Sequence, residues 1–251
     1  MPRSLRRLTV TLVLLVVSGI VSPSPAQWPP DSTENLQVLP KDIPVRELIS
    51  LMRGFAGALG VRCIHCHVGD DPNDLSSTDF PSDDRVEKRK AREMIRMVQQ
   101  INGELLAAVP ERSDPPIEVT CVTCHRGVTQ PRDVRDILTA VVLAQGADSA
   151  IATYQQLRER YYGSASYDFR DFMLANVAEG LAGREPDAAL RILEYNIQVH
   201  PQSTQSYLTI AQIEVRRGNR DAAIAALEKA ATVEPENEFW PRMIARLRGG
   251  Q

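Results

Sequence analysis

The sequence contains few of the residue types from which metal, cofactor and catalytic sites are most often built. Its 251 residues include four cysteines and four histidines, and aromatic residues make up only 5%. The apolar run from Leu8 to Val21 is shorter than the roughly 20 residues that cross a bilayer. Acidic residues (32) slightly outnumber basic ones (29), so nothing points to nucleic acid as a partner. Any metal-binding or cofactor-binding site of the chain must therefore use a small number of cysteine and histidine residues.

All four cysteines belong to one pattern that occurs twice, as Cys63-Ile64-His65-Cys66-His67 and as Cys121-Val122-Thr123-Cys124-His125. Both read C-x-x-C-H, the attachment signature of a c-type haem. Two thiols three residues apart on one helical turn can both form thioethers to a porphyrin, and the next histidine can bind the iron. The sequence therefore predicts two covalently bound haem c groups. The residues that hold them are Cys63, Cys66, His67, Cys121, Cys124 and His125.

Paired cysteines also occur in zinc sites, in thioredoxin-like redox pairs and in disulfides. Zinc ribbons usually separate their two pairs by about 15–20 residues, whereas Cys63 and Cys121 are 58 positions apart. A thioredoxin-like pair belongs in a strand–helix–strand context, and the flanking sequence here has a helical pattern. Two disulfides stay open as an alternative for an exported protein. The histidine that directly follows each pair favours haem.

The N-terminus has the features of an export signal. Arg3, Arg6 and Arg7 precede the apolar run, and small residues at 24–26 suit the usual cleavage positions. Residues 1–26 are therefore predicted to be a signal peptide, with an uncleaved anchor as the alternative and no transmembrane segment after cleavage. Export to the periplasm, or further to the cell surface or the extracellular space, agrees with the haem prediction because bacteria attach c-type haem outside the cytoplasm.

Two amphipathic helices are expected before the two motifs. The first runs from about Pro44 to Gly60, since proline suits a first helical turn and glycine suits an exit. The second runs from about Arg85 to Val109. In both helices apolar residues recur at steps of four, three and four, which places them on one face. These residues are Leu48, Met52, Phe55 and Leu59 in the first helix and Met94, Val98, Ile101 and Leu105 in the second.

The stretch from Gly69 to Asp84 is polar and holds six aspartates. Their spacing lacks the regular ligand pattern of an EF-hand calcium loop. We therefore expect this stretch to be a solvated linker between the first haem motif and the second helix.

An iron that only carries electrons needs a second axial ligand. His65 would point away from the iron of its own motif, and His200 lies at the end of a helical repeat, so both are expected to be structural. A methionine thioether suits haem iron and raises its potential. Met52, on the apolar face of the first helix, is the predicted ligand of the first haem. For the second haem the periodicity leaves Met94 and Met97 open.

From about residue 133 the pattern changes to a helical repeat. Residues 187–193 and 221–227 align at an offset of 34, and His200-Pro201 and Glu234-Pro235 share this offset. Thirty-four residues is the tetratricopeptide period, with small residues where paired helices cross and proline at the end of each unit. Residues 133–251 are therefore predicted to be a tetratricopeptide-like domain for docking or self-association.

The likeness to a known family lies in three segments, residues 59–67, 94–102 and 119–127. They resemble the cytochrome c subunit of photosynthetic reaction centres. That family builds each haem site from a helix that bears a methionine ligand, a turn and a second helix that bears C-x-x-C-H. It pairs neighbouring sites by approximate two-fold symmetry.

The resemblance covers about residues 38–132 and implies specific ligands. It implies Met52 for the first haem and Met94, in preference to Met97, for the second. The chain also departs from the family, which has four haem motifs where this sequence has two. The helical-repeat tail is foreign to the reaction-centre subunit, so the resemblance implies the haem fold and not the partner.

The sequence thus predicts an all-α protein with a dihaem cytochrome c domain over residues 27–132 and helical repeats after it. Its predicted function is one-electron transfer between a redox protein donor and a redox protein acceptor. No catalytic residue is expected, because histidine and methionine on both irons leave no site open to substrate. Two alternatives are a subunit of a conductive extracellular filament and a dihaem peroxidase with one open iron.

Overall fold

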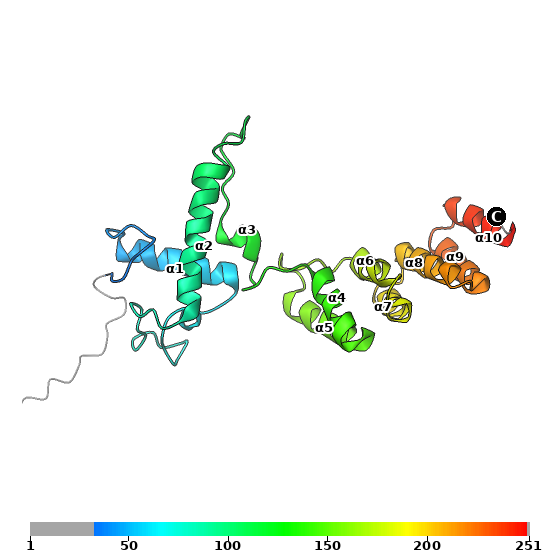
Figure 1. Cartoon of the computed structure of the whole chain (residues 1–251), viewed down its shortest axis with the longest axis horizontal. Helices are drawn as coiled ribbons and strands as arrows, with labels where there is room; N and C mark the ends of the chain where they lie inside the picture. Colours follow the sequence, from blue (N-terminus) through cyan, green and yellow to red (C-terminus); the bar gives the residue numbers. More distant parts are fainter. Residues whose placement is uncertain (1–32, 250–251) are drawn as a thin grey trace, which may run out of the picture.

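The computed structural model describes residues 33–249, and the signal peptide predicted for residues 1–26 lies outside them. Within residues 33–249 every regular element is a helix, and strand pairing is limited to one isolated bridge between Val68 and Asp79. The all-α fold class predicted from the sequence is confirmed. Figure 1 shows an elongated molecule in which an N-terminal group of helices is followed by a row of packed helices. No helix in the described range combines the length and the apolar character needed to cross a membrane.

Five helical segments form the N-terminal part. They are α1 (Val45–Leu59), the 3-10 helix η1 (Cys63–His65), α2 (Val86–Gln100), the π-helical η2 (Ile101–Leu105) and α3 (Cys121–His125). Both predicted amphipathic helices are therefore present. The second one changes to a wider π-helical turn at its end, which the apolar periodicity did not indicate.

The end of α1 lies directly against the end of the second motif. Gly60 stops the helix in a left-handed conformation, with a φ angle of 67°, which glycine adopts without steric cost. The backbone N–H of Gly127 donates to the carbonyl oxygen of Ala58 at 2.8 Å. The first Met-bearing helix thus contacts both motifs, η1 by sequence and α3 by packing.

The first motif forms a single 3-10 turn, which is tighter and shorter than an α-helix. The turn ends at Cys66, and further along the chain the backbone N–H of Asp79 donates to the carbonyl oxygen of Val68 at 2.8 Å. Residues 69–84, which we expected to be a solvated linker, therefore fold back toward the motif. Their composition is that of a linker, but their second half is tied to α2 by the contacts described below.

Seven helices follow and pack together in a row (Figure 1). They are α4 (Val134–Gln145), α5 (Ala147–Tyr161), α6 (Phe172–Leu181), α7 (Pro186–Val199), α8 (Thr204–Arg216), α9 (Arg220–Val233) and α10 (Phe239–Gly249). Helices α7 and α9 begin and end 34 residues apart. This separation equals the offset at which the two sequence segments align.

The buried apolar residues lie almost entirely in this C-terminal row. One cluster joins α4 to α8 around Leu193, and a second joins α8 to α10 around Leu227. Between residues 33 and 132, by contrast, the only buried apolar side chains are those of Ala58 and Val128. The N-terminal helices are therefore amphipathic but do not build an apolar core from their own side chains.

Candidate functional site

The imidazole ring of His67 is held by two contacts with one residue. Its Nδ1 lies 3.1 Å from the carbonyl oxygen of Phe80, and the two rings are 5.0 Å apart at an angle of 59°. Because a carbonyl oxygen only accepts, Nδ1 carries the proton and Nε2 keeps its lone pair for a metal. Burial lowers the pKa of His67, and the nearby charges of Lys88 and Arg92 lower it further, so the ring is held neutral.

A lysine on α2 fixes the loop that supplies this carbonyl. Nζ of Lys88 lies 2.7 Å from the carbonyl oxygen of Phe80. It also reaches the carbonyl oxygens of Pro81, at 2.9 Å, and Ser82, at 2.8 Å. Burial lowers the pKa of Lys88, while the Asp83 carboxylate, 3.3 Å away, opposes that shift. The hydrogen-bond acceptor of the first motif's histidine is thus itself held by a cation.

Asp83 joins α2 to the segment before α1. Its Oδ1 lies 2.8 Å from Nη2 of Arg92 and accepts a hydrogen bond from Nδ2 of Asn35 at 3.0 Å. Arg92 also donates to the carbonyl oxygen of Asn35, at 3.2 Å. Arg92, then Asn35 and Lys88, hold the pKa of Asp83 far below its usual range. The polar face of α2 is therefore a structural surface that fixes both neighbouring segments.

The second motif holds its histidine in the same way as the first. His125 is buried, and its Nδ1 lies 2.9 Å from the carbonyl oxygen of Val128. Nε2 is again the nitrogen left for a metal. The short helix α3 starts at Cys121 with a capping box, in which the backbone N–H of Thr120 donates to Oγ1 of Thr123 at 3.0 Å. A local hydrogen-bond pattern thus presets the motif's helical turn.

Asn102 clamps the approach to the second motif. Its Nδ2 donates to the carbonyl oxygen of Val119, and its Oδ1 accepts from the backbone N–H of the same residue, both at 2.8 Å. This two-way pairing fixes the backbone two residues before Cys121 against η2. Sequence reasoning did not identify this role, because an asparagine in a helix carries no local signal for a partner 17 residues away.

The cysteines do not support the two structural alternatives. All four thiols are free, so the disulfide alternative is wrong for this structure. Residues 33–249 contain no group of three or more metal-binding side chains, so the two pairs do not converge on a zinc site. Burial raises the pKa of the Cys66 thiol, with Glu87 and Cys63 adding to it, and burial also raises the pKa of Cys121.

The predicted methionine ligands lie on helix faces that protein atoms leave partly uncovered. Met94 and Met97 on α2 are 40% and 50% exposed, and Leu105 further along the same helix is 60% exposed. Met52 on α1 is half-buried. On both helices the face that bears the methionines is apolar, and neither face meets a protein core.

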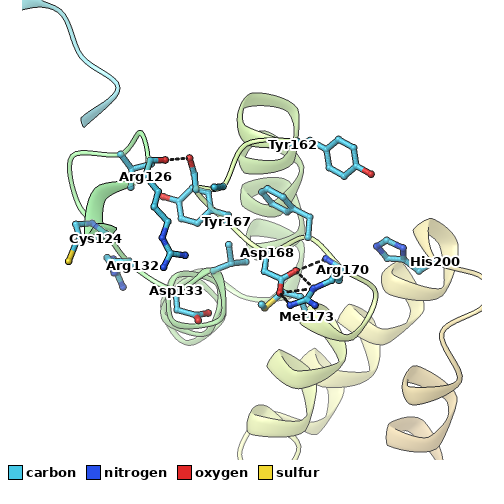
Figure 2. Close-up of a pocket in the computed structure, with 17 residues that line it drawn as sticks. Cys124, Arg126, Arg132, Asp133, Tyr162, Tyr167, Asp168, Arg170, Met173 and His200 are labelled. Atoms are coloured by element: carbon cyan, nitrogen blue, oxygen red, sulfur yellow. Dashed lines mark hydrogen bonds and ion pairs between the residues drawn. The ribbon is translucent and has the colours of Figure 1, made fainter. Parts of the chain in front are cut away.

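A cavity of about 810 Å³ lies where the second motif meets the helical row. Figure 2 shows Cys124 and Arg126 on one side of it, with Arg170 and His200 on the side of the helices. Oγ of Ser166 donates to the carbonyl oxygen of Arg126 at 2.5 Å, which ties the two sides together. Nε2 of His200 is buried and has no hydrogen-bond partner among residues 33–249.

These features fit a haem at the motifs on two independent counts. A hydrogen bond from Nδ1 to a backbone carbonyl is the arrangement that orients metal-binding histidines, and both His67 and His125 have it. The apolar faces of α1 and α2 are also left without a protein core to cover them, and a flat apolar group packed on each face would bury them.

Comparison with known proteins agrees with this fit. A sequence model of the photosynthetic reaction centre cytochrome c subunit matches residues 31–176. The chain belongs to this family. Membership implies haem c that is bound covalently. The match continues through α4 and α5 into α6, so it extends beyond residue 132, where we expected the resemblance to end.

One curated relative is also named as a cytochrome c. Cytochrome c-554 of Chloroflexus aurantiacus is 31% identical over 99 residues, which are 39% of this chain and 21% of that protein. The chain therefore spans about a fifth of the length of this curated relative. No solved structure matches the chain.

Proposed function

We propose that the chain is an exported dihaem electron carrier, with one haem c at each C-x-x-C-H motif. The observation that carries this proposal is the matched pair of histidines. Nδ1 of His67 and of His125 each bond to a backbone carbonyl, at 3.1 and 2.9 Å, which leaves Nε2 of each ring for iron. Haem c supplies a one-electron iron couple, and the residues around it bind, orient and shield it.

Each site combines a motif with a methionine from the preceding helix. The thiols of Cys63 and Cys66 would form the thioethers of the first haem, with His67 and Met52 on its iron. At the second motif, Cys121 and Cys124 would form the thioethers. His125 and a methionine of α2 would bind that iron.

Met94 is the better placed of the two methionines on α2. With about 100° of rotation per residue along α2, Met94 lies between Val98 and Ile101 on the apolar face and within about 40° of each. Met97 lies about 60° from Met94, at the edge of that face. A methionine at the centre of the face would hold the iron of a haem packed there, so Met94 is the proposed ligand.

The proposed ligand set favours a carrier function over catalysis. Histidine and methionine on both irons would leave neither iron a position for a substrate, so the protein would exchange only electrons with a protein donor and a protein acceptor. Thioether ligation favours a high potential at both irons. A dihaem peroxidase would need one iron without its methionine.

The C-terminal helices serve docking or self-association in this proposal. The division is a signal peptide at 1–26, a dihaem domain at 27–132 and tetratricopeptide-like repeats at 133–251. The 34-residue separation of α7 and α9 supports the repeat assignment.

Open-ended repeat contacts between copies would generate a filament. Measuring particle size over a range of concentrations separates the two roles, since a monomer throughout contradicts self-association.

The test of the haem sites begins with the haem content of the purified holoprotein. A pyridine haemochrome assay and intact mass should both give two covalently bound haems per chain. Carbon monoxide should then leave the visible spectrum of the reduced protein unchanged, because both irons are six-coordinate. A spectrum that shifts in the unmodified protein would reject the closed carrier and favour an open, catalytic iron.

Methionine variants then assign the ligands. Met52→Ala and Met94→Ala should each let carbon monoxide bind one of the two haems, while Met97→Ala should behave as the unmodified protein does. If Met97→Ala opens an iron and Met94→Ala does not, the second ligand is Met97 and the carrier function stands.

A further inference from the structure

The two histidines donate to carbonyl oxygens that are not equivalent. The oxygen of Phe80, which accepts from His67, also accepts from the ammonium of Lys88 at 2.7 Å. Within the described part of the chain, the oxygen of Val128 accepts from His125 and from no charged side chain. The bond to the shared oxygen is the longer of the two, at 3.1 Å against 2.9 Å.

An ammonium on the acceptor weakens the histidine's hydrogen bond. A cation draws electron density from the carbonyl lone pairs, so less remains for the Nδ1–H donor. A histidine with a weaker Nδ1–H bond has less imidazolate character and donates less charge to a bound metal. A less electron-rich iron is easier to reduce, so this effect raises the reduction potential.

The position of Lys88 makes the effect strong. Its side chain is only 12% exposed, so water screens its charge weakly. Asp83 lies within ion-pair distance of Lys88, at 3.3 Å, and of Arg92, at 2.8 Å. One carboxylate is thus shared between two cations and does not cancel both of them.

We propose that Lys88 is a tuning residue that sets the order of the two haem potentials. It raises the potential of the iron bound by His67 above that of the iron bound by His125. A single electron would then reside mainly at the first motif, and transfer within the protein would run from the second motif to the first. This inference rests on the proposed function, which supplies a histidine-bound haem at each motif.

The experiment is a spectroscopic redox titration of the complete holoprotein and four variants. Lys88→Gln should lower the potential of the first haem alone. This change should alter the equilibrium ratio of electron occupancy at the two haems by about tenfold, which corresponds to a shift of about 59 mV in the potential of a one-electron couple. Lys88→Arg, which keeps a cationic donor, should keep most of the difference. Lys90→Gln is the matched control, because it removes the same charge from an exposed position on α2 and should move neither potential.

The Met52→Ala variant identifies which redox wave belongs to the first haem. The inference is overturned if Lys88→Gln moves neither wave or moves both equally. It is also overturned if the first haem of the unmodified protein has the lower potential, a measurement that does not depend on how any Lys88 variant folds. Haem content and carbon monoxide binding are measured first on the same samples. Failure there rejects the dihaem carrier, whereas two closed haems with an unshifted potential reject only the role of Lys88.

Discussion

The carbonyl oxygen of Gly127 occupies the space that a Cβ atom on Gly60 would need. Gly60 also has a positive φ angle of 67°, so a side chain there meets both a backbone clash and an unfavourable conformation. We predict that Gly60→Ala destabilises the holoprotein by about 3 kcal/mol. Thermal or denaturant unfolding, followed through the haem absorbance, measures the loss.

Gly57→Ala is the control for this variant. Gly57 lies inside α1, and a Cβ there would meet nothing within 4 Å. Alanine favours a helix by about 0.5–1 kcal/mol relative to glycine, so Gly57→Ala should be neutral or stabilising. Equal stabilities for the two variants would show that α1 and the second motif do not touch as described.

Asn102→Ala should loosen the second motif. It removes both hydrogen bonds to Val119, and we predict a stability loss of about 1–3 kcal/mol because the partly buried backbone groups lose two partners. Gln100→Ala removes an exposed amide that donates only to Glu104 among the described residues. It should change stability by less than about 0.5 kcal/mol. Urea unfolding compares the two, and similar curves would contradict the clamp.

Stability at acid pH should depend on Asp83. Its folded-state pKa lies below the ordinary value of 3.8, first because of Arg92. Its contribution to the free energy of unfolding is therefore complete at pH values above the ordinary pKa. The contribution is lost as the pH falls below about 4 toward the folded-state pKa. Asp83→Asn should flatten the stability curve in this range and lower the plateau at neutral pH.

The control for this pH dependence is Asp84→Asn. The Asp84 carboxylate forms no ion pair with the residues that the structure describes, so its removal should leave the loss of stability at acid pH (the acid limb of the stability curve) unchanged. Unfolding midpoints measured across the pH range compare the variants. An unchanged acid limb in Asp83→Asn would show that the Arg92 contact adds nothing to stability.

Glu234→Gln should release the last helix. The Glu234 carboxylate accepts from Asn237 at 2.7 Å, and from Thr204 and Trp240 at 3.0 Å each, so it links α8 to α10. An amide retains only part of this acceptor capacity. We predict a lower unfolding midpoint and a red-shifted Trp240 fluorescence. Glu236→Gln, at an exposed position, is the control and should change neither quantity.

Local patterns in the sequence predicted the helices and the motif residues, because spacing and apolar periodicity act within one or two turns. The residues that position the histidines were not predictable in this way. Phe80 lies 13 residues from His67, and it comes from a stretch whose composition is that of a solvated linker. Lys88 also has no local signal, since a lysine on the polar face of an amphipathic helix normally faces water. Such contacts depend on how loops close in three dimensions.

The uneven distribution of buried apolar side chains has a consequence for how the protein matures. The helices after residue 133 contain their own core, so they can fold without a cofactor. The described residues before it bury only two apolar side chains, those of Ala58 and Val128, and their stability must come from haem attachment, as metal binding drives folding in small metalloproteins. A chain that has not received its haems would therefore present a folded C-terminal half and a protease-sensitive N-terminal half. Haem supply would thereby decide which chains survive.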